Sequence, residues 1–292
     1  MCTLIHCICT IQNAYTVDFS SYARTGIKGG TVFELLDGRY SPVSKLVWKT
    51  PASLDFGFRE NISLSHFICN TGVNFSMPNK WGTMKDYDYF MSGAVCQYSM
   101  HSNHLESDYT LFLDSGYRFD IKKISIVPLA GILYQHRKFS AWDGYLQIPE
   151  AGKAWNGDEE KQEVSGNGIS YEQNILLPFV KLKIGCDFYK NFLFSGSIKF
   201  SPWFFAECTD THYFRNKQFT DIMNGGFCIG AEGRIFYKKI GIVMSYEYIK
   251  SSKNAKTYSQ DIGTAGSERK LSNNYIPGIE SGIWLVGVEY KL

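Results

Sequence analysis

The chain has 292 residues, of which 44% are hydrophobic and 16% aromatic, and its formal net charge is +2. It can therefore bury a large apolar surface, and its charge gives no reason to expect a nucleic-acid partner. No run of about 18 apolar residues occurs, which excludes a membrane-spanning helix. The mean hydropathy of -0.19 suits both a soluble protein and a transmembrane β-barrel.

Residues 1–15 combine a short apolar core with a small residue, Ala14, but lack a positively charged start. We expect them to be the remnant of an export signal, so that the folded domain covers residues 16–292. Of the eight cysteines, Cys2, Cys7 and Cys9 lie in this segment. The others show no CxxC or zinc spacing, and we expect no metal site and no disulfide framework.

Alternation with a period of two residues dominates the rest of the chain and predicts β-strands. The apolar residues Phe194, Ile198 and Phe200 alternate with polar ones such as Lys199. We expect the apolar set to face lipid and Lys199 to face the barrel interior. The same pattern recurs in residues 108–118, 180–188, 240–248 and 284–292.

The connections between these strands are short at one end and long at the other. Tight turns are expected near residues 120, 190 and 238, and long polar segments at 78–104, 143–168 and 252–277. A soluble sandwich shows the same local alternation, but unequal ends are typical of an outer-membrane barrel. The pattern predicts an all-β fold, a ten-stranded antiparallel transmembrane β-barrel with long extracellular loops. Its interior should hold a network of charged side chains.

The last six residues, GVEYKL, support this localisation. Gly287, Tyr290 and Leu292 have a spacing similar to that of the C-terminal signal for barrel assembly, with Leu292 in place of the usual aromatic residue. The sequence thus predicts a protein of the bacterial outer membrane.

Two pairs of polar residues fall where strands enter the long loops. Asp210 and His212 follow an apolar strand, and Asp86 and Asp88 lie in the segment DYD. Residues two apart in a strand share a face, so Asp210 can orient His212 as a general base. Because Asp210 and His212 have the parity of the lipid-facing residues before them, we expect a bulge between Phe204 and Asp210.

The segments DYD, TDTHY, KLVWK and GILYQHRKFSAWDG resemble those of the omptin family of outer-membrane proteases, from about Val17 to Leu292. The resemblance implies an endopeptidase with its cleft outside the cell and an activated water as nucleophile. It implies no metal or other cofactor. His212 would be the base, Asp210 its orienter, Asp86 the residue that holds the water and Asp88 the acid beside the oxyanion. Substrates would be proteins or peptides.

The resemblance also implies contacts with substrate and with lipid. Ser44 and Ser99 match serines near the family's cleft, where we expect them to contact substrate rather than act as nucleophiles. Arg137 and Lys138 would bind lipopolysaccharide on the outer wall, which makes lipopolysaccharide a possible activator of a monomeric enzyme. His101 and His104 lack further metal ligands, so we expect them at the surface.

The chain departs from the family where a basic substrate residue would bind. Omptins that cut between basic residues carry an acid two residues before the dyad aspartate, where this chain has Cys208. A second acid in the first loop would fall at Gly30 or Thr31. With Cys208 and Thr31 in the specificity pocket, we expect little preference for Arg or Lys unless Glu34, Asp37 or Glu207 substitutes.

The competing hypothesis is a barrel without catalytic activity that acts as an adhesin or invasin through its surface loops. The DxD and DxH pairs favour the protease.

Overall fold

The computed structural model describes residues 17–189, 191–262, 269–272 and 274–292. The proposed signal remnant, residues 1–15, lies outside the described residues. Within the described part of the chain, every regular element is a β-strand, and no helix is long and apolar enough to cross a membrane.

The strands in chain order are β1 (Val17–Asp37), β2 (Pro42–Leu64), β3 (Phe67–Ser76), β4 (Asn79–Tyr89), β5 (Val95–Tyr117), β6 (Phe119–Ile121), β7 (Ile124–Gln147), β8 (Gln162–Tyr189), β9 (Phe192–Ser201), β10 (Phe205–His212), β11 (Lys217–Asn224), β12 (Gly226–Tyr237), β13 (Ile240–Ser251), β14 (Ala255–Asp261), β15 (Arg269–Lys270) and β16 (Ile276–Lys291).

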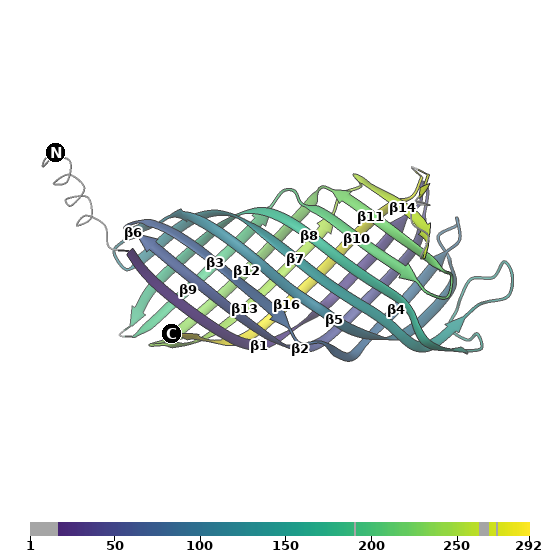
Figure 1. Ribbon diagram of the computed structural model, residues 1–292, viewed down its shortest axis with the longest axis horizontal. Coiled ribbons are helices and arrows are strands. Elements are labelled where there is room, and N and C mark those ends of the chain that lie inside the picture. The colour runs from purple at the N-terminus through teal and green to yellow at the C-terminus, as the bar shows by residue number, and fades with distance from the viewer. Residues whose placement is uncertain (1–16, 190, 263–268, 273) are drawn as a thin grey trace, which may run out of the picture.

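These segments form one closed antiparallel barrel (Figure 1). The strands β1, β2, β5, β7, β8 and β16 run without interruption. The pairs β3–β4, β9–β10, β11–β12 and β13–β14 each form one interrupted strand, which makes ten in all. Pairing between β7 and β8 closes the ring, and the short β6 and β15 add to β7 and β14. The predicted ten-stranded barrel is confirmed.

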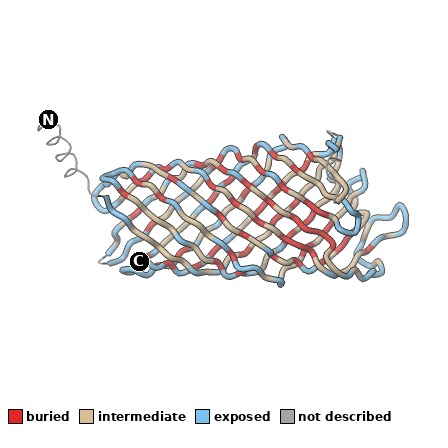
Figure 2. Tube along the Cα trace, in the orientation of Figure 1, coloured by how far each residue is buried: buried red, intermediate tan, exposed pale blue. Residues whose placement is uncertain are grey.

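Inward and outward faces alternate along the strands as expected (Figure 2). Phe194, Ile198 and Phe200 on β9 are exposed on the outer wall. Between them, Lys199 points inwards and pairs with Glu247 of β13. The outer surface is therefore apolar, as a lipid-facing wall requires.

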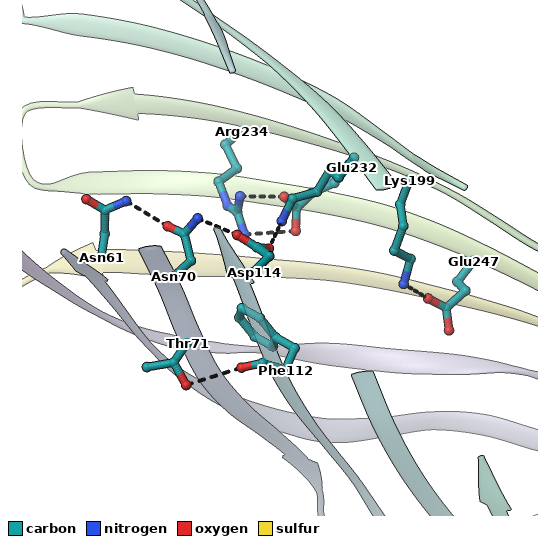
Figure 3. A network of polar contacts seen from close by, with 10 residues as sticks. Asn61, Asn70, Thr71, Phe112, Asp114, Lys199, Glu232, Arg234 and Glu247 are labelled. Atoms are coloured by element: carbon teal, nitrogen blue, oxygen red, sulfur yellow. Dashed lines mark hydrogen bonds and ion pairs between the residues drawn. The ribbon is translucent and has the colours of Figure 1, made fainter. Parts of the chain in front are cut away.

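The barrel interior is filled in two layers. One layer is the predicted network of charges, of which Figure 3 shows the Lys199–Glu247 and Arg234–Glu232 pairs. The other layer is apolar and was not predicted. Its centre is the indole of Trp48, which stacks with Phe139 at 5.5 Å and with Tyr171 at 5.8 Å between ring centroids. These three residues, which we call the floor, are fully buried and come from β2, β7 and β8.

The expected break between Phe204 and Asp210 is present. In pairing with β8, the register moves from Val180 opposite Phe200 to Leu176 opposite Phe205. The β9–β10 strand thus advances five residues while β8 advances four, and one extra residue turns all later side chains to the other face. Asp210 consequently points into the barrel.

The site lies at one end of the barrel, which we call the mouth. The mouth is the end where β4 leads into β5 and β10 leads into β11 (Figure 1). The C-terminus lies at the opposite end.

Candidate active site

The two predicted polar pairs approach the mouth from different parts of the ring. Asp86 and Asp88 lie on β4, which pairs with β2 and β5. Asp210 and His212 lie on β10, which pairs with β8 and β11. An ion pair spans the gap, because Arg215 in the turn after β10 lies 3.7 Å from Asp88. The predicted convergence of the two pairs is therefore present.

Asp210 and His212 form a close pair on the inner face of β10. The His212 Nε2 lies 2.5 Å from the Asp210 Oδ2. Burial alone would lower the pKa of His212, but the neighbouring Asp210 carboxylate outweighs it, and the net pKa is raised. When Nε2–H donates to Asp210, Nδ1 is left as the nitrogen with a free lone pair. The imidazole is thus oriented as a base.

The aspartate pair on β4 is held in a protonation state unusual for carboxylates. Burial, and then the nearby charge of Asp88, raise the pKa of Asp86 to about 7. Burial also raises the pKa of Asp88, and the charges of Arg215 and His212 reduce this rise without cancelling it. Near neutral pH, Asp86 is therefore partly protonated. Asp88 is the carboxyl that is ion-paired with Arg215.

Ser44 and Ser99 both lie beside this pair, as predicted. The Ser44 Oγ is 3.5 Å from the Asp86 Oδ1, and Ser99 is the register partner of Asp86 on β5. Ser99 also contacts His101, whose Nε2 lies 2.9 Å from its Oγ. His101 is buried at 7% exposure, so its predicted surface position is wrong.

Glu34 on β1 is the first-strand acid that enters the site. Its Oε2 accepts a hydrogen bond from the Trp48 Nε1 at 3.4 Å. Burial raises the pKa of Glu34 well above its usual value, and the charges of Asp210 and Asp221 add to the rise. Glu34 therefore lies beside the dyad and above the floor.

The predicted match of the family's first-loop acid to Gly30 or Thr31 is wrong. Val32 and Glu34 point inwards with exposures of 1% and 7%. By strand alternation Thr31 points outwards, paired in register with Lys49, and it cannot contact substrate in the barrel. Gly30 has no side chain and packs against the backbone of Gly282.

Cys208 points inwards, as its predicted role in the pocket requires. It is 1% exposed and lies next to the Tyr171 hydroxyl of the floor. Burial raises the pKa of its thiol well above the usual value, so Cys208 brings no charge to the pocket. Its neighbour Glu207 faces the exterior and does not substitute.

The two residues predicted to bind lipopolysaccharide point in opposite directions. Arg137 is 2% exposed and lies 3.4 Å from Asp108 inside the barrel, so its predicted place on the outer wall is wrong. Lys138 is partly exposed on the outer wall, 3.5 Å from Glu172. Consecutive residues of a strand face opposite sides, which makes a shared outer site impossible.

Two residues at the site escaped sequence reasoning. Arg215 lies in a turn, and its sequence position gives no sign that it reaches Asp88. Asp221 on β11 is buried opposite Cys208 and next to Thr257 of β14. The inward parity of Asp221 and Met223 was the available signal. Among the described residues, no group of three or more His, Cys, Asp or Glu side chains could hold a metal ion.

Comparisons with known proteins place this chain in a family. The model of the Omptin family matches residues 26–292. The solved structure of the outer membrane protease OmpT from Escherichia coli has a TM-score of 0.79 at 17% identity, over 96% of this chain and 98% of that one. The translocator domain of the autotransporter NalP from Neisseria meningitidis reaches a TM-score of only 0.34 at 11% identity, over 99% and 94%.

A comparison with curated protein sequences finds no match. The likeness to OmpT bears on the fold alone, since the identity is low. The family model, in contrast, spans most of the chain and agrees with the resemblance of the DYD and TDTHY segments. This chain belongs to the omptin family.

Proposed function

We propose that this chain is an outer-membrane endopeptidase in which His212, oriented by Asp210, activates the water that attacks the peptide bond. The observation that carries the proposal is the meeting of two polar pairs in one mouth. They come from different parts of the ring and are bridged by the contact between Arg215 and Asp88. A side-chain base facing carboxylates in a cleft is suited to general-base hydrolysis.

In this mechanism a water lies between His212 and Asp86. The water oxygen forms a bond to the peptide carbonyl carbon, and its proton passes to the Nδ1 of His212. The tetrahedral intermediate then breaks its bond to the peptide nitrogen. The proton on His212 transfers to that nitrogen, which leaves as an amine. Asp210 stabilises the imidazolium between the two steps.

We assign Asp88 a different role from the one expected. A donor to the oxyanion must be protonated, and the Arg215 cation 3.7 Å away favours the charged form of Asp88. Its negative charge instead contributes to the raised pKa of Asp86 and holds Arg215 over the cleft.

The other expectations from the resemblance remain part of the proposal. The mouth faces outside the cell, where protein or peptide substrates enter it. One chain is sufficient, because every group of the mechanism comes from a single barrel. Catalysis needs no metal or other cofactor, and lipopolysaccharide that contacts Lys138 on the outer wall activates the enzyme.

The test is cleavage of a degenerate peptide library by refolded protein with lipopolysaccharide, compared with His212→Ala. We expect cleavage by the wild type and none by the folded variant. Equal cleavage by both proteins would refute the assigned base. A folded wild type that cuts no peptide but still binds host surfaces would favour the adhesin hypothesis.

A further inference from the structure

The barrel interior contains a cavity of about 210 Å³ on the side of the floor that faces away from the mouth. Seven of the side chains that line it are basic and five are acidic. A liquid water takes up about 30 Å³, so the cavity has room for a small ion together with waters. No step of the proposed mechanism uses these groups.

Most of the basic side chains in this cavity have an acidic partner. The paired groups are Arg24 with Asp55, Lys28 with Asp108, Lys181 with Asp114 and Lys199 with Glu247. Asp108 also lies 3.4 Å from the buried Arg137, so it is shared between two cations. These pairs therefore leave no spare negative charge for the rest of the cavity.

Three basic side chains share the two acids that remain. The Glu289 Oε2 lies 3.3 Å from the Arg59 guanidinium and 3.2 Å from that of Arg234. Arg234 also pairs with Glu232, its neighbour on the inner face of β12 (Figure 3). The third basic side chain is Lys183 of β8, which lines the same cavity. This cluster thus carries one more positive charge than negative charges.

Lys183 is the cation that has no acid of its own. Its neighbours Leu182 and Ile184 are exposed on the lipid-facing wall, so strand alternation points Lys183 into the barrel. Within the described residues, its ammonium forms no ion pair and no hydrogen bond. The charges that act on it most strongly are those of Arg59 and Arg234, which repel it. An unpaired charge away from bulk water is costly unless a counter-ion accompanies it.

We propose that Lys183, Arg59 and Arg234 bind a small inorganic oxyanion, such as phosphate, in this cavity. The anion cancels the unpaired positive charge, and its oxygens accept hydrogen bonds from the three cations. The Arg59 Nε is shielded from solvent and has no hydrogen-bond partner, so it is one donor available for this contact. An oxyanion suits guanidinium groups better than a halide does, because a guanidinium can donate two parallel hydrogen bonds to its oxygens.

The bound anion stabilises the barrel and takes no part in catalysis. Lys183, Arg59 and Arg234 come from β8, β2 and β12, which lie in different parts of the ring. An anion that contacts all three links these strands through the interior, and a ligand that binds only the folded state stabilises that state. The cavity and the mouth lie on opposite sides of the floor, so occupancy of the cavity does not depend on the proposed protease activity.

The experiment measures the midpoint of thermal unfolding of the refolded protein in detergent, followed by the heat-dependent shift of barrels in gel electrophoresis. Inorganic phosphate is titrated against sodium chloride at equal ionic strength, without lipopolysaccharide, whose phosphates would compete. We expect a saturable rise of the wild-type midpoint with phosphate. Lys183→Met should weaken this response about 10- to 100-fold in phosphate concentration, because it removes a hydrogen bond between charged groups.

The same variant makes a second, opposite prediction in the absence of phosphate. Lys183→Met removes an unpaired charge and keeps a long side chain, so its midpoint in sodium chloride should equal or exceed that of the wild type. Lys253→Met, in the exposed loop between β13 and β14, is the matched control and should respond to phosphate as the wild type does. An equal phosphate response in Lys183→Met and the wild type would overturn the site.

Binding to the wild type alone gives a test that needs no variant to fold. Equilibrium dialysis with radiolabelled phosphate should show saturable uptake of one anion per barrel, with competition by unlabelled phosphate and little by chloride. Absence of saturable uptake by the folded wild type would refute the proposal, as would equal competition by chloride.

Discussion

Asp210 on β10 lies close enough to Glu34 on β1 for its charge to help raise the pKa of Glu34, although these two strands are not neighbours in the barrel. Burial, together with this nearby charge, disfavours the ionised form of Glu34. The protonation of Glu34 is therefore coupled to the carboxylate that orients His212. A change in the charge of Glu34 would change the surroundings of the dyad at the same time.

Loss of the base should abolish catalysis without unfolding the barrel. We expect His212→Ala to lower kcat by about 100- to 10,000-fold, the range typical of general-base catalysis. His66→Ala is the matched control, since His66 is half exposed in the turn between β2 and β3 and far from the mouth. Cleavage of a fluorogenic peptide measures both. Retention of more than about a tenth of the activity in folded His212→Ala would contradict the mechanism.

The acid limb of the pH profile should report Asp86. The mechanism needs ionised Asp86 to hold the water, and burial together with Asp88 raises the pKa of Asp86 to about 7. Activity should therefore fall as pH drops through about 7, where Asp86 gains its proton. Neutral His212 is lost in the same direction, because its pKa is also raised. The limb describes the coupled groups rather than one residue.

Removal of Asp88 tests which charge determines the pH at which activity falls on the acid side of the profile. Asp88→Asn deletes the like charge beside Asp86, which lowers the pKa of Asp86 and moves the acid limb of kcat/KM to lower pH. Asp158→Asn, in an exposed loop, should leave the limb in place. A limb that moves to higher pH in Asp88→Asn would show that another group controls it.

The ring of strands could be predicted because it depends on local alternation and on loop lengths. The break before Asp210 could also be predicted. The lipid-facing apolar residues up to Phe200 and the polar pair Asp210 and His212 all lie at even-numbered positions, which would put them on the same face of an unbroken strand. One inserted residue was the only way to keep both assignments. These features can be predicted without knowing which strands meet across the barrel.

The pocket could not be predicted because its members meet across the barrel. One uncertainty is which face of β1 points inwards near the mouth. That orientation decides whether Gly30, Thr31 or Glu34 reaches the site. The pairing of Cys208 with Asp221 depends on the register of the β10–β11 hairpin. The floor combines β2, β7 and β8, three strands with long sequence separations. The inward position of Arg137 follows from alternation along β7, because its neighbour Lys138 faces outward.

The floor should contribute strongly to stability. Trp48→Ala removes a fully buried indole that stacks with Phe139 and Tyr171, and we expect a loss of about 3–5 kcal/mol in the free energy of unfolding. It also removes the donor to Glu34. Trp81→Ala is the matched control, since Trp81 is 84% exposed. Denaturant unfolding followed by tryptophan fluorescence measures both, and similar midpoints for the two variants would contradict a stabilising floor.

Lys138 should determine the response to lipopolysaccharide, and Arg137 should not. Lys138 projects from the outer wall beside Glu172, where its ammonium can pair with a lipid phosphate. We expect Lys138→Ala to raise the lipopolysaccharide concentration for half-maximal activation several-fold, with unchanged activity at saturation, because an exposed charge pair contributes up to about 1 kcal/mol. Lys239→Ala, in the short turn at the opposite end of the barrel, is the charge-matched control. Titration of peptide cleavage with lipopolysaccharide gives both values. Identical activation curves for Lys138→Ala and the wild type would exclude Lys138 from the lipid contact.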